Sequence, residues 1–597
     1  MMASEASRPV SARITRSSGR HAVGRSPGVW GPPRQAPGEV WPGYPTRTAE
    51  PFKPDSVGPR GLPGSGQPWF RRRHLPLAVI GAIQVSLALP LVWSNTAFAD
   101  EADYLWVGRL MIAHWLHGKS WPASYGHRVL SGSPVIYPPL GAIVSNLAGL
   151  AGARILSVAF MLGATILLYF TASSLFGRIV GIIATALWAT TEPVFRLTFA
   201  TYDPMSVFLV AFAAWLAVEA GWRRRAGPFI ASAATLALAN ATAYSSMVID
   251  PVMLAFAFLV LLPRIGSRRA AKWTASFGAA WLALFCVLIS VSGTWAGIAF
   301  TILTRNVKDH QPPSAILGAI AVYSAFMIIT ALAGAVIGIK AEQWRRPLLV
   351  VIGASALLVP AAQMYFQTAW ALDKHLALDM WFASMAAGYG CFMAGRWVMR
   401  RVRARPGIIA SAGAIALLGV LAADWQLASL ALHKWPDTTS FITALRPLTA
   451  RTSGPVFASA EQRVGEYYTQ LGSKWWLWQT KGLSLDPARI PRSGWNEYYA
   501  DQVAAGRYSL IALFYAAPQS GAVIGAGTAP GARGGPVYAE LARLKNFKLN
   551  EPGVPALTSA LERDRGYRLA AVGPYDSSDA NGVYAIWQRI SPNGSAR

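Results

Sequence analysis

Residues 314–338 read SAILGAIAVYSAFMIITALAGAVIG, a run of apolar and small residues without a single charged side chain. In a helix that rises about 1.5 Å per residue, a run of this length crosses the roughly 30 Å hydrocarbon core of a bilayer. Runs of the same kind recur on both sides of it, from His74 to Leu427. The sequence therefore predicts a polytopic α-helical membrane protein.

The composition points the same way. Of the 597 residues, 53% are hydrophobic and 14% are charged, and the mean hydropathy is +0.33. An ordinary soluble chain carries about 25% charged residues. These values exclude a soluble enzyme, a fibrous protein and a wholly disordered chain. The two cysteines, Cys286 and Cys391, are too few for a disulfide framework or a cysteine-rich metal site.

We expect eleven membrane-spanning helices, each of about 17–25 residues. They are predicted at residues 75–94, 154–175, 179–198, 204–221, 227–244, 247–263, 272–292, 314–338, 347–366, 377–398 and 407–427. One further apolar stretch, PPLGAIVSNLAGLAG at residues 138–152, is only about 15 residues long. That length is typical of a re-entrant or interfacial helix rather than of a span.

The charged residues support this topology. With a cytoplasmic N-terminus and residues 138–152 outside the bilayer core, basic clusters such as Arg223–Arg225 lie inside, and acids such as Asp103 and Asp309 lie outside. Counting 138–152 as a span would reverse every later loop, against the positive-inside rule. The basic cytoplasmic loops also explain much of the formal charge of +26, so we expect membrane lipids and no nucleic acid as partners.

Three regions follow from this pattern. Residues 1–70 are rich in Pro, Gly, Ser and Arg and lack apolar periodicity, which predicts a disordered basic cytoplasmic tail. No apolar core follows its first charges, so we do not expect a cleavable signal peptide here. Residues 71–430 form the transmembrane domain, and residues 431–597 form an extracytoplasmic soluble α/β domain.

Strand and helix patterns alternate in the C-terminal region, which favours a small three-layer sheet domain. Strands are expected at 454–460, 508–517, 567–575 and 582–590, and helices at 461–472, 496–506 and 537–547. No Gly-rich phosphate loop opens a helix there, so a nucleotide site is not expected. A structural lid and a binding site for an acceptor or a cell-wall glycan are both open as roles for this domain.

An acidic cluster directly follows the first span, in AFADEADYLWVGRLMIAHWLHGKSWP at 97–122. If residues 100–117 are helical, the period of about 100° per residue brings four side chains to one face: Asp100, Asp103, His114 and His117. Acids are also common at helix starts, where they stabilise the first turn, so capping is the alternative role. No third or fourth ligand accompanies the two histidines, and we expect no metal.

Other polar residues are expected at the same outer surface. Asp203 stands where the third span ends, in TFATYDPMS, and capping is its alternative role. Lys374 and His375 stand at the outer end of the tenth span, and Arg305, Lys308 and His310 lie in the loop TRNVKDHQPPS. External cations beside lipid run against the positive-inside trend, and a lipid phosphate would explain them, although solvation explains Arg305 and Lys308 equally well.

These motifs resemble a known family. The first span, Asp100-Glu101 with Tyr104 after it, YPPL at 137–140 and FRLTFATYDP at 195–204 are similar to the polyprenyl-phosphate-sugar-dependent glycosyltransferases of the GT-C fold. Family 39, with the protein O-mannosyltransferases and the bacterial aminoarabinose transferase, is the nearest group. The resemblance covers about residues 74–400. The segment NATAYSS at 240–246 departs from it, because it lacks the Lys often found there.

The resemblance implies a site and a mechanism. Asp100 would be the catalytic carboxylate, with Glu101 as its partner, and Asp203 the second acidic position. Tyr137 and Pro138, with Pro139, would lie on a re-entrant helix beside the site. Members of this group generally use neither a nucleotide sugar nor a catalytic divalent ion, so we expect no cofactor.

The expected reaction is an inverting sugar transfer in a bacterial plasma membrane. A polyprenyl phosphate sugar would enter from the outer leaflet, with its phosphate held by Lys374 and by His375 or Arg109, and with Asp103 also contacting substrate. Asp100 would act as the general base for a hydroxyl of a glycan, lipid or protein acceptor, a role worth on the order of 10²–10⁴ in rate.

Two other classes of protein are compatible with the composition. A transporter would need polar or broken helices at mid-membrane, whereas the ionisable residues here collect at the ends of the spans. A non-catalytic anchor that displays the C-terminal domain would not need Asp100, Asp203 and Lys374 at one surface. A membrane glycosyltransferase is the favoured prediction.

Overall fold

The computed structural model describes residues 69–304, 311–341, 343–369, 371–402, 406–432, 435–479, 495–516, 541, 554–576 and 581–590. Almost all of the predicted basic tail, residues 1–70, lies outside these ranges. The loop residues Arg305, Lys308 and His310 also lie outside them.

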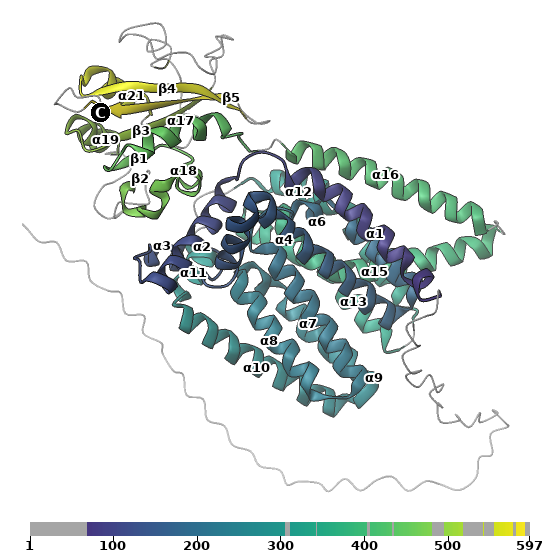
Figure 1. Ribbon diagram of the computed structural model, residues 1–597. Helices are drawn as coiled ribbons and strands as arrows, with labels where there is room; N and C mark the ends of the chain where they lie inside the picture. The colour runs from purple at the N-terminus through teal and green to yellow at the C-terminus, as the bar shows by residue number, and fades with distance from the viewer. Residues whose placement is uncertain are drawn as a thin grey trace, which may run out of the picture. The chain divides into compact units, whose positions relative to one another are not determined.

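The described residues between 69 and 432 are mainly helical (Figure 1). Its first half contains α1 (Trp69–Val92), α2 (Ala99–His117), α3 (Ala123–Val129), α4 (Tyr137–Phe176), α5 (Arg178–Ala189), α6 (Glu192–Arg196), α7 (Asp203–Arg223), α8 (Ala226–Thr242) and η1 (Tyr244–Ile249). Its second half contains α9 (Asp250–Ile265), α10 (Ser267–Ser292), α11 (Trp295–Ala299), η2 (Phe300–Thr304), α12 (Pro313–Gly338), α13 (Arg345–Ala354), η4 (Ser355–Leu357), α14 (Leu358–Phe366), α15 (Leu372–Val402) and α16 (Pro406–Leu432).

Seven helical segments of the described chain are long and apolar enough to cross a membrane. They are His74–Val92, Tyr137–Phe176, Asp203–Arg223, Tyr244–Ile265, Ser267–Ser292, Pro313–Gly338 and Arg345–Phe366. All seven overlap predicted spans, and the prediction of a polytopic helical membrane protein is confirmed. The total of eleven spans stays a prediction.

One predicted span is interrupted. Instead of a single helix at 179–198, the structure has α5 and then the short α6. The hydroxyls of Thr190 and Thr191 donate back to carbonyls of the preceding turn, including that of Trp188 at 3.0 Å. Pro193 then opens α6, since proline has no N–H to give to the preceding turn. Local threonine hydrogen bonds and a proline therefore end the helix early.

The short segment at 138–152 is the first arm of a bent helix. Within α4 the backbone is non-helical at Ala148 and at Gly149, where φ is 67° and ψ is −168°. A φ of this sign favours glycine. The arm before the bend, residues 137–147, is about 16 Å long at the helical rise, which is too short to cross the bilayer. This geometry agrees with the expected re-entrant or interfacial helix.

Small residues let the long helices pack closely. α7 lies beside α8, and α8 beside α10 (Figure 1). α12 and α15 approach until their backbones touch, because a Cβ atom on Gly334 would lie 1.9 Å from the carbonyl oxygen of Ala386. Such close approach of small residues is characteristic of helix packing in membranes.

The C-terminal region folds around a mixed five-stranded sheet. Its strands are β1 (Val456–Ala458), β2 (Trp478–Gln479), β3 (Leu510–Ala516), β4 (Tyr567–Asp576) and β5 (Asn581–Arg589), in the order β2-β1-β3-β5-β4. β1 is parallel to β2 and β3, whereas β5 is antiparallel to β3 and β4. The helical elements are α17 (Thr439–Ala450), α18 (Gln462–Tyr468), η5 (Gln470–Ser473), η6 (Trp475–Leu477), α19 (Trp495–Ala504) and α21 (Val554–Arg563).

Alternate strand residues face two separate cores. Leu510 and Ala512 of β3 pack with residues of α17 and α18, whereas Ile511 and Leu513 pack with residues of α19 and α21. The sheet is therefore the middle of three layers, as the alternating pattern predicts. The four expected strands are present, and β2, α17 and α21 are additional. Of the helix expected at 537–547, only Leu541 lies within the described residues.

Candidate active site

A cavity of about 600 Å³ opens between the starts of several helices. Its lining comes from α2, the first turn of α7, η1, η2, α14 and the first turn of α15. Three of these contributions, from α2, α7 and α15, are N-terminal ends of helices of 19 to 31 residues. The positive ends of these helix dipoles therefore meet at one place, which favours a negatively charged group there.

One wall of the cavity carries the charged residues. Lys374 Nζ lies 2.8 Å from Asp100 Oδ2, and the side chains of Lys374 and Asp100 are 14% and 38% exposed. Asp203 lines the same wall and accepts a hydrogen bond from the Thr201 hydroxyl at 3.0 Å. His375 Nδ1 lies 3.3 Å from the amide nitrogen of Gln363. The structure thus brings together four residues that the sequence singles out: Asp100, Asp203, Lys374 and His375.

Another part of the lining is apolar. Met247 and Val248 come from η1, Ile302 from η2, and Phe366 from α14. The cavity therefore combines charged groups with a hydrocarbon surface, which suits a ligand that has a polar head and an apolar tail.

A pair of tyrosines lines the same cavity as the two carboxylates. Tyr104, one turn after Asp100 on α2, donates its hydroxyl hydrogen to Tyr202 Oη at 2.9 Å, and the ring centroids are 4.4 Å apart. Burial, reinforced by the negative charge of Asp100 and Asp203, raises the pKa of Tyr104 well above its usual value, so its hydroxyl remains protonated. Neither tyrosine is among the site residues expected from the sequence, although Tyr104 and Tyr202 stand beside the two acidic motifs.

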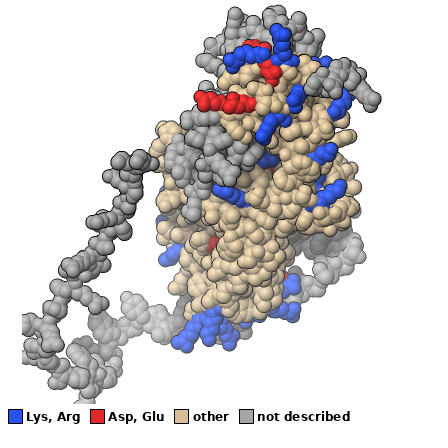
Figure 2. All heavy atoms as spheres, turned by 90° about the vertical axis from the view of Figure 1, so that its left-hand side faces the viewer, with Lys and Arg blue, Asp and Glu red and all other residues tan. Residues whose placement is uncertain are grey.

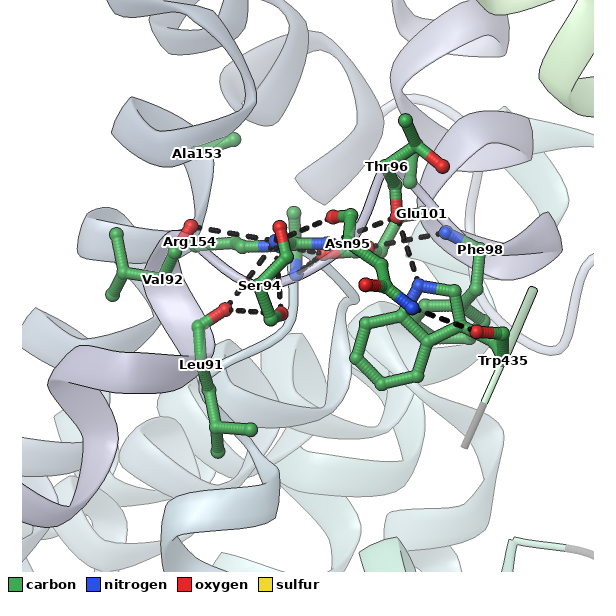
Figure 3. A network of polar contacts seen from close by, with 12 residues as sticks. Leu91, Val92, Ser94, Asn95, Thr96, Phe98, Glu101, Ala153, Arg154 and Trp435 are labelled. Atoms are coloured by element: carbon green, nitrogen blue, oxygen red, sulfur yellow. Dashed lines mark hydrogen bonds and ion pairs between the residues drawn. The ribbon is translucent and has the colours of Figure 1, made fainter. Parts of the chain in front are cut away.

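Glu101 does not line the cavity, although it follows Asp100 directly. Figure 3 shows it beside Arg154. Its carboxylate forms a buried ion pair with Arg154 of α4, at 2.7 Å between Oε2 and Nη2. Oε1 also accepts a hydrogen bond from the backbone N–H of Ala200 at 2.8 Å. In a helix, successive side chains diverge by about 100°, which explains why neighbouring acids reach different surroundings.

Asp103 and Arg109 face the C-terminal region rather than the cavity. Asp103 accepts a hydrogen bond from Tyr125 at 2.7 Å and lies 3.5 Å from Nε of Arg463 on α18. Arg109 donates to the carbonyl oxygen of Tyr467 at 2.8 Å, and its guanidinium lies 4.3 Å from the ring centroid of that tyrosine. Both residues therefore fasten α2 to α18.

Tyr137 and Pro138 are buried where α4 begins. A Cβ on Gly108 of α2 would lie 1.9 Å from the carbonyl oxygen of Pro138, so α2 and the start of α4 are in backbone contact. Neither Tyr137 nor Pro138 lines the cavity.

His114 and His117 are exposed at the other end of α2. Within the described residues, no group of three or more His, Cys, Asp or Glu side chains could hold a metal ion.

Comparison with solved structures defines the class of this fold. The oligosaccharyltransferase AglB of Archaeoglobus fulgidus, solved with an inhibitory peptide and a dolichol-phosphate, superposes with a TM-score of 0.51 at 13% identity, over 74% of this chain and 70% of that chain. Its apo form gives a TM-score of 0.50 at 11% identity, over 75% and 70% of the two chains. The protein has a GT-C fold, as the resemblance implies.

The sequence comparison is more particular. The family model described as dolichyl-phosphate-mannose-protein mannosyltransferase matches residues 134–295, which run from the YPPL motif to α11. The structure of ArnT of Cupriavidus metallidurans, solved with undecaprenyl phosphate, is 12% identical over 85% of this chain and 97% of that chain, with a TM-score of 0.34. Comparison with curated protein sequences gives no match.

Proposed function

We propose that the protein is a membrane glycosyltransferase that moves a sugar from a polyprenyl phosphate donor to a hydroxyl of an extracytoplasmic acceptor, with inversion. The observation that carries the proposal is the cavity, in which Asp100, Asp203 and Lys374 lie beside an apolar surface. A polyprenyl phosphate has this same division between an anionic head and a hydrocarbon chain. The GT-C fold and the mannosyltransferase match support the same class of reaction.

The donor phosphate would bind at Lys374. The ammonium group is at the start of α15, where the helix dipole adds to its attraction for an anion. His375 is the second candidate contact. Since Lys374 is paired with Asp100 in the structure, a bound phosphate would compete for the ammonium and leave the carboxylate able to accept a proton.

Asp100 would act as the general base. It would take the proton of the acceptor hydroxyl while that oxygen attacks the anomeric carbon from the face opposite the phosphate. The bond between the anomeric carbon and the phosphate oxygen breaks, and the polyprenyl phosphate leaves without needing an acid. A general base contributes on the order of 10²–10⁴ in rate. The acceptor can be a glycan, a lipid or a protein.

We also propose that the cavity faces the outside of the cell. Figure 2 shows Lys and Arg gathered at the lower end of the helical part. Exposed basic residues lie where α7 meets α8 and where α10 begins: Arg223, Arg224, Arg225, Arg268 and Arg269. The positive-inside rule supports a cytoplasmic position for these connections. We further propose that residues 1–70 are a cytoplasmic tail, residues 71–430 the transmembrane catalytic domain and residues 431–597 an extracytoplasmic domain.

The test is a transfer assay with purified full-length protein. A panel of radiolabelled polyprenyl phosphate sugars, with mannose as the first member, would be incubated with glycan, lipid and peptide acceptors. We expect one donor to give a labelled product and to release polyprenyl phosphate in equal amount. Absence of transfer and of hydrolysis with every donor would contradict the proposed reaction.

A further inference from the structure

The ion pair between Arg154 and Glu101 is completely enclosed by protein. The two side chains are 1% and 0% exposed. Nε of Arg154 lies 2.8 Å from Oε1, and Nη2 lies 2.7 Å from Oε2, so the contact is bidentate. Two parallel charge-assisted hydrogen bonds fix the relative orientation of the guanidinium and the carboxylate, whereas a single contact would let them rotate.

Arg154 also contacts the chain just before the acidic cluster (Figure 3). Nη1 lies within hydrogen-bond distance of the carbonyl oxygens of Leu91 and Val92, both at 3.3 Å, and of Asn95 at 3.2 Å. Nη2 lies 3.4 Å from the carbonyl oxygen of Thr96. The last carbonyl oxygens of α1 have no N–H donor within the helix, and they carry the negative end of the helix dipole. The guanidinium of Arg154 supplies donors to these oxygens, and its positive charge offsets the dipole. Arg154 therefore fixes the end of α1 and the link to α2.

Glu101 connects this link to the segment that carries the other carboxylate. Oε2 accepts from the N–H of Phe98 at 3.4 Å, and Oε1 accepts from the N–H of Ala200 at 2.8 Å. Asp100 lies one residue before Glu101, and Asp203 lies three residues after Ala200. One buried carboxylate thus contacts both segments that bring an acid to the cavity.

We infer that Arg154 and Glu101 are positioning residues, which set the distance between Asp100 and Asp203 for the proposed sugar transfer. This inference rests on the proposed function, since it concerns the same cavity. Neither side chain lines the cavity, so the pair acts only through the backbone that it holds. A displacement of about 1 Å at a reacting group can cost on the order of 10²-fold in rate. Loss of the pair should therefore lower kcat and leave donor binding at Lys374 unchanged.

The decisive variant removes both charges, Arg154→Met with Glu101→Gln. Removing one partner would leave an uncompensated buried charge, whereas removing both leaves none. With the donor that the wild type uses, polyprenyl phosphate mannose in the first instance, we expect kcat to fall about 10- to 100-fold and the donor KM to change by less than about 3-fold. A wild-type kcat, or a higher KM with an unchanged kcat, would overturn the inference.

A conservative variant covers the case in which the double variant does not fold. Arg154→Lys keeps a cation beside Glu101 but lacks the planar fork that reaches the carbonyl groups. We expect its kcat to lie between those of the wild type and the double variant. A wild-type kcat for Arg154→Lys would show that the fork is unnecessary, which contradicts the inference.

A matched control tests whether the loss of any buried polar contact between α1 and α4 lowers kcat in the same way. Thr165 of α4 donates to Gln84 of α1 at 2.7 Å, in a buried contact away from the cavity. Thr165→Val should keep the wild-type kcat and KM. An equal loss of kcat in Thr165→Val would show that any disturbed packing between α1 and α4 lowers kcat, which contradicts a specific role for Arg154.

Asp100→Asn separates the two proposals. If Asp100→Asn is inactive and the double variant fully active, only the positioning role fails, whereas an active Asp100→Asn removes the proposed base.

Discussion

Asp100 and Glu101 show how one residue of helical rotation separates two chemical environments. Asp100 reaches the cavity and pairs with Lys374, and 38% of its side chain is exposed. Glu101 reaches Arg154 and is fully buried. A base has to meet its substrate, so only Asp100 has access to an incoming hydroxyl. The structure therefore supports different roles for two acids that the sequence presents as a pair.

The first prediction concerns Asp100. Asp100→Asn keeps the size of the side chain but removes its basicity, so we expect glycosyl transfer to fall by about 10²-fold or more. Expression and donor binding should persist. Transfer would be followed with labelled polyprenyl phosphate sugar, and Glu219→Gln, in the exposed pair with Arg223, is the matched control. Normal transfer by Asp100→Asn would contradict the mechanism.

The second prediction concerns Lys374. Lys374→Ala removes a charge-assisted contact to the donor phosphate, which is worth about 1.5–3 kcal/mol, so the donor KM should rise by roughly 10- to 150-fold. Lys374→Arg should recover only part of this, because an ammonium group and a planar guanidinium differ in geometry. The measurement is the initial rate as a function of donor concentration. An unchanged KM for Lys374→Ala would assign the phosphate to other residues.

At the scale of single residues, the sequence predicts which charged residues are unusual better than it predicts which residues they pair with. Asp100 and Asp203 could be found because they are acids next to the ends of predicted spans, and Lys374 and His375 because external cations run against the positive-inside trend. The four residues line one cavity, and their roles stay proposals. Arg154 gave a signal of the same kind, as a lone arginine between apolar stretches, but only the structure gives it Glu101 as a partner. Pairs that are 53 residues apart in the chain leave no local pattern.

At the scale of helices, features set by the local sequence are predicted well, whereas features set by contacts with other residues are not. The long apolar runs predict α7, α10 and α12 well, because length and hydropathy are properties of the run itself. The break between α5 and α6 depends on which threonines bond back to the helix, which the apolar pattern does not show. The contact of α18 with α2, made by Asp103, Arg109 and Arg463, could not be read from either helix alone.

The third prediction concerns α18. Burial raises the pKa of Glu466 from 4.5 to about 7, while Arg463 acts in the opposite direction. The folded protein therefore holds this proton more tightly than the unfolded chain does. The raised pKa of Glu466 therefore adds to the free energy of unfolding, and this contribution is fully present below about pH 4.5. It is lost as the pH rises to about 7, which lowers the free energy of unfolding by at most about 3 kcal/mol.

Thermal unfolding in detergent at pH 5 to 8 would check this dependence. Glu466→Gln keeps hydrogen-bonding groups beside Gln462 and Arg463 but cannot ionise, so its midpoint should decline less between pH 5 and pH 8 than that of the wild type. Glu497→Gln, at an exposed position of α19, is the control. Equal pH dependence in the wild type and Glu466→Gln would rule out this contribution.

For the whole molecule, the sequence predicts the class of fold but not its final count of spans. Composition and repeated apolar runs suffice for a polytopic membrane protein with a sheet domain after it. The interrupted α5–α6 region and the bent α4 show why counting is harder, since a helix can enter the apolar layer without crossing it. Sidedness depends on the distribution of cations between the loops and stays a prediction.

The last prediction tests this sidedness in intact cells. Cys286 and Cys391 would first be replaced by alanine, and single cysteines would be introduced at exposed positions. Reporters at Arg224 and Arg268 should resist a membrane-impermeant thiol reagent, because basic connections favour the cytoplasm. Reporters at Lys119, after α2, and at Glu497, in the sheet domain, should be labelled. After cell lysis all four should react, which shows that each thiol is accessible. Labelling of Arg224 and Arg268 from outside, with protection of Lys119, would invert the protein and move the cavity to the cytoplasmic face.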